Sequence, residues 1–144
     1  MAALLAGCDS VYGPQRTVAV TQLPSPAVVV AALQATPGVR DVTQREVPAH
    51  TEWSLYDGTE RYPAFHQFSF GDEAVGGTIE TKQDAQGVNH LRLYSLWLHQ
   101  RPSKAQLERT RTLLDAAYLN LRRSAPGLPP PQAVKETLIG YPPK

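Results

Sequence analysis

The stretch Ser103-Lys104-Ala105-Gln106, followed by LERTRTLLDAAYLNLRR over residues 107–123, decides the fold. It opens with a capping box, in which the Ser103 hydroxyl accepts a hydrogen bond from the backbone of Gln106 and the Gln106 side chain reaches back to Ser103. We therefore predict a helix over 103–124, ended by Pro126-Gly127. A mostly apolar stripe at helical spacing predicts that one face is buried against a sheet, and it contains Leu107, Thr110, Leu114, Ala117 and Leu121, with Tyr118 beside it.

Aromatic and β-branched runs before this helix predict four consecutive antiparallel strands. They cover residues 53–56, 65–70, 77–83 and 88–99, and the turn residues between them are Asp57-Gly58, Gly71-Asp72 and 84–87. The last strand changes phase. Leu91 and Leu93 alternate on one face and Leu96 and Leu98 on the other, which predicts either a bulge near Tyr94 or burial on both faces.

The N-terminal half predicts a strand over 17–23, a helix over 25–35 and a second strand over 39–47. Ser25 is a helix cap, Pro26 suits the first helical position, and Pro37-Gly38 ends the helix. This strand–helix–strand order is similar to the first half of ferredoxin-like domains. Such domains often bind metals or small ligands, but the chain has no metal-binding cysteine pair, so the resemblance implies topology alone.

Together these elements predict one α+β domain over 17–127. An antiparallel sheet of about five or six strands is expected to be covered on one face by the helices 25–35 and 103–124, as a two-layer sandwich. Residues 128–144 are expected to form a Pro-rich C-terminal extension that packs on the domain. Within that extension, residues 131–138 are expected to form a short helix.

The N-terminal residues Leu5-Ala6-Gly7-Cys8 resemble the lipobox of bacterial lipoproteins, which is Leu, two small residues and Cys. The resemblance implies that the Cys8 thiol is acylated and that the chain is cut before it. Residues 1–8 would then be a partial signal whose true start lies upstream, because a signal also needs a basic region and roughly 7–15 apolar residues. Residues 9–16 would be a flexible tether. The alternative is a cytosolic protein in which Cys8 is an ordinary buried residue.

The resemblance implies a lipid-anchored protein of the bacterial cell envelope that faces the periplasm, and it leaves the choice between inner and outer membrane open. The formal net charge is +1, which gives no reason to expect nucleic acid as a partner. No later apolar run approaches the roughly 18–20 residues that span a bilayer. We therefore expect the N-terminal lipid to supply the membrane contact.

Catalytic and metal-binding motifs are absent from the sequence, and we expect no cofactor and no bound metal. The four histidines are His50, His66, His90 and His99. Hairpins closing at 71–75 and 84–87 would align His66, Thr81 and His90 across three strands on one face. The pair of His66 and His90 supports the alternative function, a small envelope hydrolase or metal-dependent enzyme.

Tyr56, Asp57 and Tyr62 lie in a loop region with two tyrosines, which is typical of protein-binding surfaces. Because no nucleophile or metal-ligand spacing accompanies them, the sequence favours a binding protein over an enzyme. We therefore expect a non-enzymatic module that binds a protein of the cell envelope through Tyr56, Asp57 and Tyr62. Its role would be that of an assembly component or of an inhibitor or immunity factor.

Overall fold

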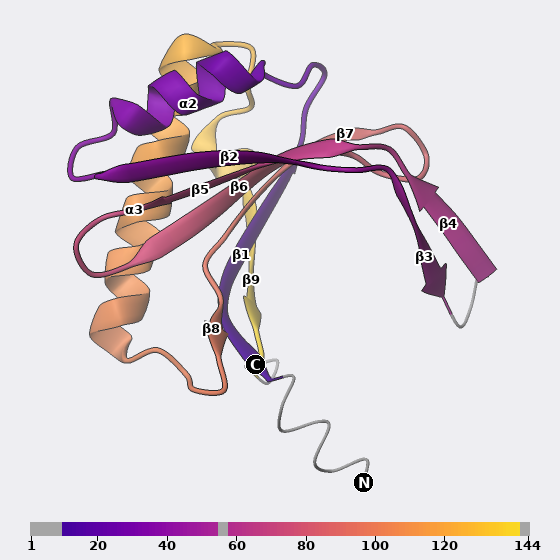
Figure 1. The fold of residues 1–144 in the computed structure, drawn as a ribbon. Helices are drawn as coiled ribbons and strands as arrows, with labels where there is room; N and C mark the ends of the chain where they lie inside the picture. The colour runs from indigo at the N-terminus through magenta and orange to yellow at the C-terminus, as the bar shows by residue number, and fades with distance from the viewer. Residues whose placement is uncertain (1–9, 55–57, 142–144) are drawn as a thin grey trace, which may run out of the picture.

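The computed structural model describes residues 10–54 and 58–141, and its architecture is α+β, with a curled antiparallel sheet and two helices (Figure 1). The helices are α2 (Pro26–Gln34) and α3 (Lys104–Ser124), and the 3-10 turn η1 covers Pro131–Ala133. The strands are β1 (Val11–Ala19), β2 (Asp41–Val47), β3 (His50–Ser54), β4 (Gly58–Tyr62), β5 (Phe65–Gly71), β6 (Gly76–Gln83), β7 (Asn89–Tyr94), β8 (Trp97–Leu98) and β9 (Lys135–Ile139).

The main sheet runs in the order β2-β5-β6-β7-β1, and every pairing in it is antiparallel. β1 pairs with β7 and then β8 along one edge, and with β9 along the other. β3 and β4 form a separate two-stranded sheet. The predicted antiparallel sheet is therefore confirmed.

Both predicted helices are confirmed, and local capping explains where each begins. Ser103 and Gln106 form the complete capping box at the start of α3, and the Ser25 hydroxyl accepts from the Val28 N–H at the start of α2. Leu114 and Leu121 are fully buried, as predicted, whereas Leu107 is only half-buried. Leu113, which the predicted stripe omitted, is buried instead.

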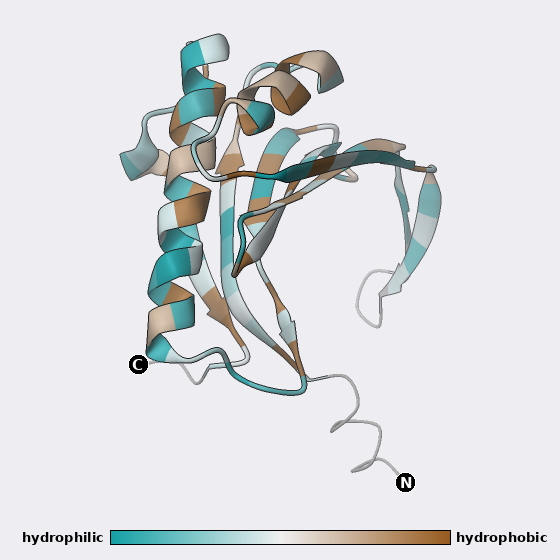
Figure 2. Cartoon of the chain, turned by 60° about the vertical axis from the view of Figure 1, so that its left-hand side comes forward, coloured by the Kyte–Doolittle hydropathy of each residue, from teal (hydrophilic) through white to brown (hydrophobic). Residues whose placement is uncertain are grey.

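The core lies between the two helices and the sheet face that they cover. Both helices lie on the same side of the sheet (Figures 1 and 2). The sheet contributes alternate residues of each strand, because successive side chains of a strand point to opposite faces. The fully buried large apolar side chains of this core are Val29, Leu33, Phe68, Ile79, Leu91, Leu93, Leu114 and Leu121.

The N-terminal segment differs from the prediction. Residues 11–16, expected in a flexible tether, belong to β1, and β1 ends at Ala19 instead of residue 23. The tether prediction was wrong because Gly13 and Pro14 belong to a strand and do not mark a linker. Pro14 is in fact fully buried, and a Cβ at Gly13, which has φ +147°, would collide with the Ser95 carbonyl oxygen. The glycine thus permits a close strand contact.

The C-terminal extension also differs from the prediction. Residues 131–133 form only the short turn η1, and residues 135–139 form the edge strand β9 where a helix was expected. The extension is therefore part of the sheet and completes the second edge of β1. Tyr118 of α3 helps to hold the connection, because its hydroxyl donates to the Pro129 carbonyl at 2.6 Å.

The predicted strand 88–99 is interrupted between β7 and β8, but it contains no bulge near Tyr94. Gln15 lies opposite Tyr94 and Tyr12 lies opposite Trp97, so two residues separate the pairs on each strand and none is inserted. The interruption lies at Pro14, which has no N–H to donate to the ladder. Beyond it Leu96 is half-buried and Leu98 is 65% exposed on the other face, so burial on both faces does not extend to Leu98.

The same effect separates the β3–β4 hairpin from β2 and β5. His50 pairs with Tyr62 and Val47 pairs with Phe65, so the two pairs of strands share one register. Pro48 and Pro63 lie between them, one on each strand, and neither can donate to the ladder. The hairpin therefore continues β2 and β5 but bends away from the sheet, and it projects on the side away from α3 (Figures 1 and 2).

Candidate functional site

The projecting β3–β4 hairpin lies in the region where the sequence predicts partner binding. Of the three predicted partner-binding residues, Tyr62 lies on β4, while Tyr56 and Asp57 are outside the described residues. The predicted lipidation residue Cys8 is outside them too. The structure therefore places the arms of the hairpin and Tyr62, and it does not describe the tip.

The base of the hairpin is fixed by aromatic stacking. The His50 ring stacks on the Tyr62 ring with centroids 5.6 Å apart, and it also contacts Phe65. The Lys82 Nζ lies 4.6 Å from the centroid of the Phe65 ring and 5.6 Å from that of Tyr62. Tyr62 is thus half-buried, and its ring packs between His50 and Lys82 at the base of the hairpin.

One face of the hairpin carries two carboxylates directly opposite each other. Glu52 pairs with Glu60 across the strands, an arrangement that is unfavourable for like charges. Each has a local partner: His50 Nε2 lies 3.0 Å from Glu52 Oε1, and the Tyr62 hydroxyl donates to Glu60 Oε2 at 2.7 Å. These hydrogen bonds are the main cause that raises the pKa of His50 and that of Tyr62.

The opposite face of the hairpin is exposed and is centred on Trp53. The side chains of Thr51, Trp53, Thr59 and Arg61 alternate with the acidic face, and all four residues are exposed. Trp53 is 71% exposed, the highest value among the exposed large hydrophobic residues that the structure describes. Trp and Arg are among the residue types enriched at the energetic centres of protein interfaces. Sequence reasoning assigned Trp53 to a strand and missed its exposure, because the bend at the two prolines was not predicted.

The two histidines of the alternative enzyme hypothesis lie on opposite faces of the sheet. His66 pairs with Thr81 as predicted, but Thr81 pairs with Leu91, and His90 pairs with Lys82. The prediction was wrong by one residue because the turn after β6 is closed one residue later, by the Asp84 N–H donating to the Val88 carbonyl. A shift of one residue moves a side chain to the other face. His66 and His90 therefore do not form a joint site.

The sheet face that the helices leave open carries a polar network around Glu80. This carboxylate is only 5% exposed at its side chain. It accepts hydrogen bonds from Gln67 at 2.9 Å, from the Tyr94 hydroxyl at 2.9 Å and from Arg92 at 3.3 Å. Burial, followed by the charge of Glu80, raises the pKa of Tyr94. These three partners lie on β5 and β7, the strands on either side of β6.

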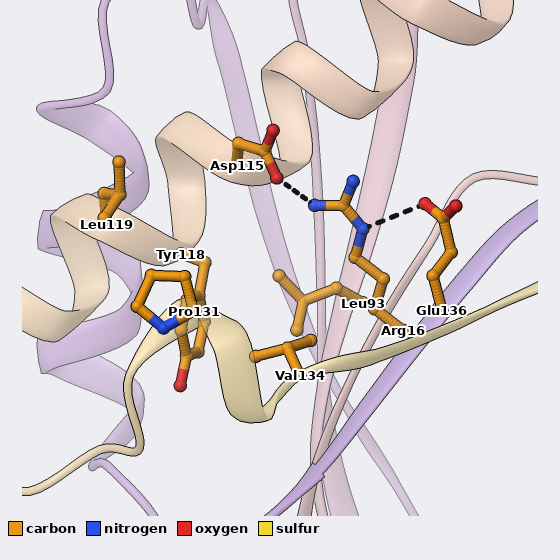
Figure 3. A pocket seen from close by; sticks show the side chains of 8 residues that line it. All are labelled: Arg16, Leu93, Asp115, Tyr118, Leu119, Pro131, Val134 and Glu136. Carbon is orange, nitrogen blue, oxygen red and sulfur yellow. Dashed lines mark hydrogen bonds and ion pairs between the residues drawn. The ribbon is translucent and has the colours of Figure 1, made fainter.

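A cavity of about 450 Å³ lies between α3 and the segment that contains η1 and β9. Figure 3 shows Asp115, Tyr118 and Leu119 on α3 and Pro131, Val134 and Glu136 on the segment of η1 and β9, with Arg16 of the sheet between Asp115 and Glu136 and Leu93 beside it. Arg16 forms ion pairs with Asp115 and, at 3.1 Å, with Glu136. Glu136 also accepts from Arg111 at 2.7 Å. Burial opposes the effect of these two arginines, but they lower the pKa of Glu136 below its usual value.

Neither a metal centre nor a membrane span is found in the described parts of the chain. Residues 10–54 and 58–141 contain no group of three or more His, Cys, Asp or Glu side chains that could hold a metal ion. Over the same residues, no helix is both long enough and apolar enough to cross a bilayer. Comparisons with protein-family models, curated proteins and solved structures found no match to this chain.

Proposed function

We propose that the protein is a non-enzymatic protein-binding module, held to the bacterial cell envelope by a lipid on Cys8 and facing the periplasm. In this proposal it acts as an assembly component or as an inhibitor or immunity factor. The fold is a two-layer sandwich whose helices cover one sheet face, and the hairpin β3–β4 contacts the partner. The observation that carries the proposal is Trp53, 71% exposed on a hairpin that projects from the sheet.

The exposed face of the hairpin has the composition of a binding surface. Trp53 supplies a large exposed apolar area, and burying it against another protein is favourable by about 25 cal/mol per Å² of apolar surface. Arg61 supplies a cation and Thr51 and Thr59 supply hydroxyl groups around it. A central aromatic residue with a polar rim is the usual anatomy of an interface.

A photo-crosslinking amino acid at position 53 tests the partner contact in cells that produce the full chain. We expect a discrete adduct with one envelope protein. Val88, which is 44% exposed in the turn after β6, is the matched control position and should give no such adduct. With the captured partner purified, Trp53→Ala should weaken binding about 30-fold, which corresponds to about 2 kcal/mol for an interface hot spot. An affinity that is unchanged by Trp53→Ala would contradict the proposal.

The lipid anchor is tested by metabolic labelling with palmitate in the full-length protein and in Cys8→Ser. We expect the wild-type chain to carry the label and to stay in the membrane fraction in high salt, because acyl chains contribute about 0.8 kcal/mol per buried methylene and are not screened by ions. The serine variant should lose both the label and the membrane association. Label retained in Cys8→Ser, or wild-type protein found soluble in the cytosol, would refute the anchor.

A further inference from the structure

The outer edge of β9 presents backbone groups that no other described strand uses. The Pro14 carbonyl accepts from the Ser95 N–H at 3.1 Å, so the backbone of Pro14 faces away from β9. Leu138 is paired with Pro14 and therefore points its own N–H and C=O away from β1. Because the direction of the backbone N–H and C=O groups alternates along a strand, Glu136, two residues from Leu138, also points these groups away from β1. β9 thus has a free edge, the kind of edge to which another strand can add.

The cavity beside α3 lies on the helix-covered side of this edge. A residue paired with Val134 or Glu136 would point its side chain to the same side as they do, toward α3. There the cavity offers apolar contacts from Tyr118, Leu119 and Val134, and Leu119 is 45% exposed. Its volume of about 450 Å³ lies within the range of roughly 300–1,000 Å³ that is usual for ligand sites.

The charges around the groove, which is the space between α3 and the free edge of β9, favour an acidic residue in the added strand. Arg16 and Arg111 are neutralised by Asp115 and Glu136. Lys135 is exposed on the other face of β9, and none of the ion pairs found among residues 10–54 and 58–141 involves it. A carboxylate on the residue opposite Lys135 would face this lysine directly.

We propose that the groove between α3 and β9 binds an extended segment of a partner protein, which pairs with the free edge of β9. An apolar side chain of this segment occupies the cavity beside Val134 and Leu119. The residue next to it in the segment is acidic and pairs with Lys135. This is strand addition, in which main-chain hydrogen bonds supply affinity and alternate side chains supply specificity. The groove is independent of the hairpin and acts as a second contact surface.

The first test selects ligands from a random heptapeptide library displayed on phage, with the full chain carrying Cys8→Ser as bait. We expect enriched heptapeptides to contain an apolar residue directly next to an acidic one. A fluorescein-labelled copy of the most enriched heptapeptide then gives the affinity by fluorescence polarisation. No enrichment over an uncoated surface would overturn the proposal.

Leu138→Pro tests the main-chain pairing, since it removes one edge N–H, and Leu138→Ala is the matched control that removes the side chain and keeps the N–H. We expect the proline variant to bind the heptapeptide about five- to tenfold more weakly than the alanine variant, as for one lost hydrogen bond. Equal affinities would overturn the pairing. Leu119→Lys, at an exposed position of α3, tests the cavity without touching β9 and should weaken binding by a similar factor.

Lys135→Glu tests the charge assignment by rescue. We expect this variant to bind the acidic heptapeptide about tenfold more weakly and to prefer the same peptide with lysine in place of the acidic residue. Trp53→Ala should leave heptapeptide binding unchanged, which separates this proposal from the hairpin function. A dimer of the chain in light scattering that Leu138→Pro dissociates would assign the edge to a second copy and overturn the peptide proposal.

Discussion

The two faces of the sheet bury their residues by different means. On the face covered by α2 and α3, burial comes from apolar packing around residues such as Phe68, Ile79 and Leu93. On the open face, Glu80 is almost as well buried, yet its environment consists of hydrogen bonds from Gln67, Tyr94 and Arg92. The helix face is therefore stabilised by removing apolar surface from water, and the open face by satisfying polar groups.

This difference shows that a sheet face without a covering helix can still bury its side chains and hold them in fixed positions. A carboxylate is tolerated at this depth because it accepts several hydrogen bonds and faces an arginine. Apolar packing tolerates changes of shape better than a polar network tolerates the loss of one member. The loss of unfolding free energy should therefore depend on the size of the replacement residue on the helix face, and on whether it still accepts hydrogen bonds on the open face.

The largest effect is expected on the helix face, from Leu114→Ala. Leu114 is fully buried, and its truncation leaves a cavity that the neighbouring side chains fill only partly. We expect the free energy of unfolding to fall by about 2–5 kcal/mol, measured by urea denaturation. Leu119→Ala, on the same helix but 45% exposed, is the control and should cost far less. Equal costs for the two variants would contradict the assigned core.

On the open face, Glu80→Ala is expected to cost about 2 kcal/mol, because it leaves Gln67, Tyr94 and Arg92 without their shared acceptor. Arg92 keeps part of its hydration, since its side chain is 31% exposed, and this limits the penalty. Glu80→Gln keeps an acceptor of the same shape and should cost clearly less. If glutamine and alanine destabilise the protein equally, the network is not what holds this face together.

The smallest effect concerns acid pH and the ion pairs of Glu136 on the helix face. The folded-state pKa of Glu136 is lowered, so its stabilisation is present above the unfolded pKa of about 4.3 and is lost as pH falls through the folded value. Urea unfolding should show Glu136→Gln less stable than wild type at pH 7, and the difference should shrink toward pH 3. Glu46→Gln, on β2 and outside the ion pairs found, is the control. A difference that is constant with pH would exclude this linkage.

Local signals predicted the helices and most of the strands. The capping box of Ser103 and Gln106 and the Ser25 cap act within one turn, so the sequence alone contains the reason for each helix start. The strands 39–47, 65–70 and 77–83 had clear turn residues at their ends. By contrast, β9 follows three prolines and has no local signal, because its strand conformation depends on pairing with β1.

The site was less predictable because it depends on strand register and on prolines. The pairing of His66 with His90 failed at one turn residue, whose placement depends on Asp84 and on Gly87 at φ +83°. The exposure of Trp53 depends on the bend of the hairpin. That bend arises because Pro48 and Pro63 lie at nearly the same level on two paired strands. Each proline can be read from the sequence, but the pairing of the two strands that carry them cannot. The bend therefore could not be predicted from either proline alone.

The early start of β1 has a geometric consequence if Cys8 carries a lipid. β1 begins at Val11, three Cα–Cα steps after Cys8, so the strand cannot begin more than roughly 11 Å from the acylated residue. The end of the molecule that carries Tyr12, Arg101 and Tyr141, whose side chains contact one another, then lies at the height of the lipid headgroups. A long tether would let the domain tumble and sample partners throughout the periplasmic space. With Cys8 acylated, the short connection would restrict this search to two dimensions and would present the β3–β4 hairpin to proteins that share the same membrane surface.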